Sequence, residues 1–94
     1  MLNTMKSVVS YLETDLKLCK DEIEKLCVEE LLVSAKVNLK RNNDCVKFYE
    51  YLWQELDLAK ENYKKDTNNK FIRSRYFALK RVEFALGLKE RRVG

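Results

Sequence analysis

The chain holds few side chains that could carry out chemistry, because its 94 residues include no histidine. Histidine is the commonest general base and metal ligand in proteins. A zinc site would have to combine Cys19, Cys27 and Cys45 with a carboxylate, and their scattered spacing matches no zinc motif. Acidic pairs such as Glu29 and Glu30 are adjacent, so they point in different directions on a helix. The sequence therefore predicts a non-enzymatic protein with no metal, no cofactor and no small-molecule substrate.

The cysteines also indicate a cellular compartment. Cys19 and Cys27 are eight residues apart, so on one helix their Cα atoms lie about 12 Å from each other, too far for a disulfide. Cys45 would reach either of them only through tertiary packing. Free thiols are typical of a reducing cytosol, and no stretch approaches the roughly 20 apolar residues that cross a bilayer. We expect a cytoplasmic protein that does not enter the membrane.

Positive charge is concentrated at the C-terminal end. Residues 68–94 carry eight basic and two acidic side chains, a net charge of +6, whereas the whole chain has a net charge of +4. Such a cluster is typical of a surface that meets an anionic partner. We expect an acidic protein surface or nucleic-acid phosphates to be contacted by Arg73, Lys80, Arg91 and Arg92. The alternative is that arginines of this segment neutralise acids of the first predicted helix.

Aromatic residues point to a second contact surface. Residues 48–53 hold four aromatic side chains in six positions, and on a helix these cannot all face one core. We expect Tyr51 and Trp53 to lie in an exposed patch that binds a partner protein or a second copy of the chain. Phe77 and Phe84, which lie among the basic residues, are expected in the core, because large apolar side chains are usually buried.

The elements that must position these residues are predicted to be helices. Proline is absent, there are only two glycines, and dense turn signals occur only at residues 41–44 and 66–69. Sheet proteins need turn residues at much shorter intervals. We expect an all-α protein of one domain, residues 1–94, with three helices in an antiparallel bundle over about residues 3–40, 44–64 and 69–91.

The first predicted helix carries an apolar seam whose residues alternate in steps of four and three. This spacing is typical of a helix that packs along another helix, as in a coiled coil. A helix of roughly 37 residues is about 55 Å long, whereas the two shorter helices reach only about 32–35 Å. We therefore expect a homodimer whose seam consists of Met5, Val9, Leu12, Leu16, Cys19 and Ile23, continued by Leu26, Val33 and Val37.

The alternative is a monomer in which the chain bends near Thr14 and the first segment folds back as a fourth helix. The absence of Gly and Pro from residues 3–40 favours the continuous helix. The apolar stripe is broadest between Leu26 and Val33, which is typical of a helix contacted on two sides.

Together these patterns favour a small adaptor, inhibitor or regulator that binds a partner protein. Small helical proteins without catalytic residues occur often among phage and mobile-element accessory factors, and the chain fits that class. The alternative is a nucleic-acid-binding regulator that uses the basic last helix. Binding with a steep salt dependence would favour the alternative, because phosphate contacts release counterions.

Overall fold

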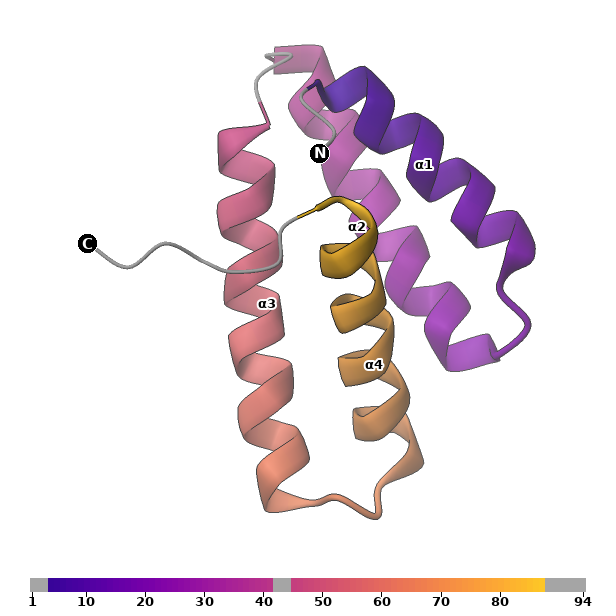
Figure 1. The fold of residues 1–94 in the computed structure, drawn as a ribbon, viewed down its shortest axis with the longest axis vertical. Coiled ribbons are helices and arrows are strands. Elements are labelled where there is room, and N and C mark those ends of the chain that lie inside the picture. Colours follow the sequence, from indigo (N-terminus) through magenta and orange to yellow (C-terminus); the bar gives the residue numbers. More distant parts are fainter. Residues whose placement is uncertain (1–3, 42–44, 88–94) are drawn as a thin grey trace.

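The computed structural model describes residues 4–41 and 45–87, and all regular structure within these two ranges is helical. Its helices are α1 (Met5–Leu18), α2 (Glu22–Arg41), α3 (Val46–Lys65) and α4 (Lys70–Ala85). The α1–α2 and α3–α4 pairs are antiparallel hairpins, and α2 packs against each of the other three helices (Figure 1). The predicted all-helical bundle is confirmed, but it has four helices rather than three.

The continuous helix predicted over residues 3–40 is wrong, because the chain reverses at residues 19–21. Cys19 has an extended backbone (φ −66°, ψ 132°), and its N–H donates to the carbonyl of Asp15 at 3.0 Å, which ends α1. The Oδ1 atom of Asp21 then accepts the N–H groups of Ile23 at 2.9 Å and Glu24 at 3.0 Å. These bonds satisfy two free amides in the first turn of α2. An aspartate cap thus starts the new helix without Gly or Pro.

The reversal places the first segment beside α2 as a fourth helix, although the bend lies after Leu18 rather than near Thr14. The molecule measures 38 × 36 × 20 Å, so it contains no rod of about 55 Å. The predicted dimer seam is instead largely covered inside a single chain. Its buried residues are Met5, Val9 and Leu12, and its half-buried residues are Leu16, Cys19 and Ile23. Its predicted continuation on α2, Leu26, Val33 and Val37, is exposed.

The core draws side chains from all four helices. Burying each large apolar side chain stabilises the fold by roughly 1.5–3 kcal/mol. As the breadth of its apolar stripe predicted, α2 is contacted on more than one side. The largest fully buried side chains are Phe48, Met5, Leu12, Leu31, Leu52, Leu79 and Leu86.

Two other helix ends follow local signals in the sequence. Side-chain oxygens of Thr4 and Asn69 accept backbone N–H groups at the starts of α1 and α4. The last helix was expected to continue to about residue 91, but α4 ends at Ala85. Gly87 follows with φ 80°, a left-handed conformation that glycine adopts readily just after a helix. Residues 88–91 of the predicted helix lie outside the described residues.

Candidate interaction surfaces

The cysteine side chains are free thiols, and burial raises the pKa of two of them. Burial raises the pKa of Cys27 to about 11, although the nearby charge of Arg75 lowers it. Burial also raises the pKa of Cys19, and the negative charge of Asp15 raises it further by a smaller amount. A protonated thiol is a weak nucleophile and a poor metal ligand. Among the residues that the structure describes, no three cysteine or acidic side chains gather closely enough to hold a metal ion.

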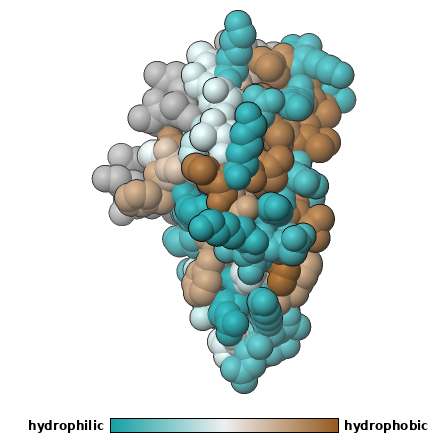
Figure 2. Space-filling model, turned by 90° about the vertical axis from the view of Figure 1, so that its right-hand side faces the viewer, coloured by the Kyte–Doolittle hydropathy of each residue, from teal (hydrophilic) through white to brown (hydrophobic). Residues whose placement is uncertain are grey.

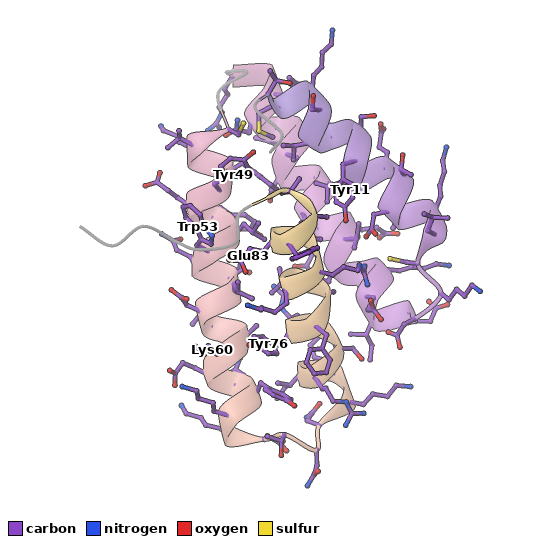
Figure 3. The ribbon with its side chains drawn as sticks, viewed as in Figure 1. Tyr11, Tyr49, Trp53, Lys60, Tyr76 and Glu83 are labelled. Carbon is purple, nitrogen blue, oxygen red and sulfur yellow. The ribbon has the colours of Figure 1, made fainter. Side chains whose placement is uncertain are left out.

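Arg81 joins α4 to both sides of the turn between α1 and α2. Its Nη2 lies 3.0 Å from Asp15 Oδ2 and donates to Cys19 Sγ at 3.4 Å, and its Nη1 donates to Glu24. Burial alone would lower the pKa of Arg81, but the hydrogen bonds to Glu24 and Asp15 outweigh it and raise the pKa. Tyr11 lies on α1 close to this group (Figure 3). Burial is the main cause that raises the pKa of Tyr11, and the negative charge of Asp15 raises it further. We call this group the Arg81 clasp.

Arg75 makes a second bridge from α4, less than two turns before Arg81. Its Nη2 lies 2.9 Å from Glu55 Oε1 on α3, and its Nη1 lies 3.4 Å from Glu30 Oε2 on α2. Both arginines therefore neutralise acids on other helices, which is the alternative that the sequence left open for this basic segment. Part of the positive charge that suggested an anionic partner is neutralised inside the fold.

The outward face of α4 carries a row of alternating cations and phenylalanines. We call it the α4 stripe; its spacings of three, four, three and four residues place it on one side of the helix. All of its side chains are exposed: Lys70, Arg73, Phe77, Lys80 and Phe84. Arg73 and Lys80, two of the predicted contact residues, thus lie together, whereas Arg91 and Arg92 lie outside the described residues.

The expectation that Phe77 and Phe84 belong to the core is wrong. Phe77 is 49% exposed and Phe84 is 72% exposed. Phe77 rests on an aromatic group between α3 and α4, since its ring centroid lies 5.6 Å from that of Tyr63 and 5.7 Å from that of Tyr76. Phe77 is therefore held in place by neighbouring rings while much of it faces solvent.

Glu83 is the acid of α4 that turns inward. It is buried between α3 and α4, and its Oε1 lies 3.5 Å from Nζ of Lys80, one turn earlier (Figure 3). The Lys80 side chain remains half exposed. Lys80 therefore has two roles open to it, as an internal ion-pair partner of Glu83 and as an outward charge of the α4 stripe.

Tyr51 and Trp53 were expected to share one exposed patch, but they do not. They are two residues apart on α3, so they point about 200° from each other around the helix. Both are partly buried against the core. The Trp53 ring lies 6.4 Å from that of Tyr49 (Figure 3), whereas the Tyr51 ring lies 6.5 Å from that of Phe48.

Tyr51 instead lines a groove between α2 and α3, with a volume of about 700 Å³. We call it the α2–α3 groove. It continues along α2 to Leu26, because a neighbouring hollow shares three of its lining residues. Exposed apolar residues on its walls are Leu26, Val33, Val37 and Val46. Figure 2, which shows one side of the molecule, has hydrophobic patches at the surface between hydrophilic side chains.

Sequence reasoning missed this groove because it assigned Leu26, Val33 and Val37 to the seam of a long helix. A signal was present in the same residues. Seven and four positions separate them, and a second apolar row, which includes Val28 and Leu31, lies on another side of the same helix. Two apolar rows on one helix indicate two contact faces, and only one of them is buried in this fold.

Comparison with known proteins gives no matching family model and no significant similarity to a curated protein or to a solved structure. In the described part of the chain, no helix has both the length and the apolar composition needed to cross a membrane. The two exposed surfaces that could bind a partner are the α4 stripe and the α2–α3 groove.

Proposed function

We propose that the protein is a non-enzymatic interaction protein, an adaptor, inhibitor or regulator whose α4 stripe binds another protein. The observation that carries the proposal is the exposure of Phe77 and Phe84 beside the cations of the same face. Exposed aromatic anchors flanked by charge are typical of binding hot spots. The partner that fits is a segment with acidic residues on both sides of an apolar centre.

The geometry favours a protein over a nucleic acid because few cations of α4 are available. Arg75 and Arg81 are engaged with acids, which leaves Lys70, Arg73 and Lys80 on the α4 stripe, and Lys80 is shared with Glu83. Three phosphate contacts give a salt dependence with a log–log slope of only about −2 to −3. Binding to nucleic acid through this face alone would then be weak at physiological salt.

The nucleic-acid alternative retains one supporting observation, the alternation of rings and cations along the α4 stripe. Bases stack on exposed aromatic side chains while cations contact phosphates in proteins that bind single strands. Fluorescence anisotropy with single-stranded and duplex oligonucleotides in low salt, about 50 mM, tests this alternative. Binding that Phe84→Ser abolishes would support it, and the absence of binding to both probes would eliminate it.

Affinity capture with the whole chain as bait tests the protein-binding proposal. We expect one protein to be recovered by the unmodified chain and lost with Phe84→Ser or Arg73→Glu. Matched controls are Phe71→Ser, an exposed phenylalanine of α4 outside the stripe, and Lys60→Glu, an exposed cation of α3. Both controls should retain the protein. Equal capture by Phe84→Ser and Phe71→Ser would contradict the proposal.

All variants in this comparison must keep their helical circular dichroism, because a loss of structure would remove binding for an unrelated reason. The exposure of the substituted side chains predicts that the fold is retained. We also propose a cytoplasmic location, where the three free thiols would stay reduced. Labelling of the cellular pool with a thiol reagent after denaturation measures that redox state.

A further inference from the structure

The α2–α3 groove leaves a long apolar surface uncovered on the central helix of the fold. Leu26, Val33 and Val37 of α2 are 54%, 63% and 45% exposed, and Val46 at the start of α3 is 57% exposed. The row from Leu26 to Val37 spans about 16 Å at 1.5 Å per residue. Single exposed apolar residues are ordinary, but a row of this kind along one groove is typical of an interface.

The charges beside this row are separated by sign along α2. Glu29 and Glu30 lie toward the N-terminal end of the row, and Lys40 and Arg41 lie at its C-terminal end. All four side chains are exposed, although Glu30 also pairs with Arg75. On α3, Lys47 and Glu50 line the same groove one turn apart and largely offset each other. The groove is therefore acidic at one end and basic at the other.

A surface with this polarity is complementary to itself. A two-fold axis across α2 at the level of residue 35 sets two copies of the helix antiparallel. It then brings Val33 of one copy opposite Val37 of the other. Glu29 and Lys40 lie on one flank of the apolar row and Glu30 and Arg41 on the other, so Glu29 meets Lys40 of the second copy and Glu30 meets its Arg41. The Leu26 end of one groove meets the Val46 end of the other. A closed two-fold dimer requires this kind of self-complementary surface.

We propose that a second copy of this chain covers the α2–α3 groove, with the two α2 helices antiparallel and their acidic and basic ends paired. This interface uses none of the α4 stripe, so the proposed partner-binding face remains free in the dimer. It shares Leu26, Val33 and Val37 with the dimer seam that the sequence predicted for one long first helix, but not Met5, Val9 and Leu12, which are buried within the chain.

The size of the surface predicts a dimer of modest affinity. One face of a helix of 20 residues, about 30 Å long, with the first turns of α3 beside it, lies at the small end of specific interfaces. We therefore expect a dissociation constant of about micromolar order. Sedimentation equilibrium between low and high micromolar concentrations should show the mass rise from that of the 11.2 kDa chain toward twice that value.

Charge reversal distinguishes a second copy from any other occupant. Glu29→Lys and Lys40→Glu should each weaken self-association about tenfold or more, because each places like charges opposite one another in the symmetric dimer. The double variant Glu29→Lys/Lys40→Glu should regain self-association. An equimolar mixture of the two single variants should also form a heterodimer, since positions 29 and 40 then carry opposite charges wherever they meet.

Val33→Asp tests the apolar centre, with Leu58→Asp as the matched control on an exposed leucine of α3 outside the groove. Val33→Asp should abolish the dimer, whereas Leu58→Asp and Phe84→Ser should leave it intact. If Val33→Asp fails to fold, the charge-reversal pair still decides the question. A monomer at all concentrations, or single variants that the double variant does not rescue, would overturn the proposal without bearing on the α4 stripe.

Discussion

The cations of α4 are divided between two faces with different surroundings. Arg75 and Arg81 reach four carboxylates on the other three helices, whereas Arg73 and Lys80 lie on the exposed α4 stripe. Arg73 and Arg75 are only two residues apart, but this turns them about 200° around the helix. The net charge of a segment therefore overstates what a partner can contact, because the fold neutralises the charges that face inward.

Among the charged side chains of α4, removing Arg81 should have the largest effect on stability. Arg81→Met keeps most of the side-chain volume but leaves Asp15 and Glu24, both mostly buried, without their partner. We expect the free energy of unfolding to fall by about 2–3 kcal/mol, below the full cost for a buried pair because Arg81 is partly exposed. Arg73→Met should change it by less than about 0.5 kcal/mol. If urea unfolding shows the same loss of unfolding free energy for Arg81→Met and Arg73→Met, the proposed difference between the two faces is wrong.

The buried thiol of Cys27 on α2 predicts a pH dependence of stability. Its pKa is about 11 in the folded chain against 9.0 without burial, so the folded state holds the proton more tightly. Stability should be unaffected below about pH 8 and should fall by about 2 kcal/mol as the pH rises from about 9 to about 11. Unfolding of the chain and of Cys27→Ala at several pH values isolates this slope. An identical slope in both proteins would show that other groups cause it.

The Arg75 bridge should matter less than the clasp. Glu55→Gln removes one charge of the 2.9 Å pair with Arg75, and both side chains are about three-quarters covered. We expect a loss of about 1 kcal/mol, since Glu30 still pairs with Arg75. Glu61→Gln, at an exposed position of the same helix, is the control and should be neutral. Thermal unfolding of both variants measures the difference.

The outward face should give the smallest effect on stability. Phe84→Ser removes a side chain that is mostly in solvent, so we expect a change of at most about 0.5 kcal/mol. Leu79→Ala, on the inward side of the same helix, should cost about 2–5 kcal/mol. A large loss from Phe84→Ser in chemical denaturation would mean that this ring packs inside the fold, and the α4 stripe would lose its main anchor.

Much of the helical fold follows from the sequence, and the error has a specific cause. The absence of proline, the apolar spacing and the two dense turn signals predicted the bounds of α3 and the start of α4 closely, but not the end of α4. The break before α2 was missed because its signal is a single capping aspartate, Asp21, in a stretch rich in acids. A heptad seam continues in the sequence across such a break, so periodicity alone does not reveal where a helix reverses.

The candidate surfaces were predicted less well than the fold. Arg73 and Lys80 were selected and do lie on one exposed face, whereas Tyr51 and Trp53 were grouped and lie on different sides of α3. The exposure of Phe84 depends on which side of α4 faces α2 and α3. The buried side carries Leu79, Val82 and Leu86, and Phe84 lies on the opposite side of the helix.

The Arg81 clasp has a consequence for the order in which the chain is completed. Arg81 and Asp15 are separated by 66 positions, and Arg81 and Glu24 by 57. During synthesis the hairpin of α1 and α2 emerges first, so Asp15 and Glu24 stay without their Arg81 partner until α4 leaves the ribosome. A nascent chain that stops before α4 would lack both ion pairs of the clasp, and the addition of α4 would join the two sides of the first turn.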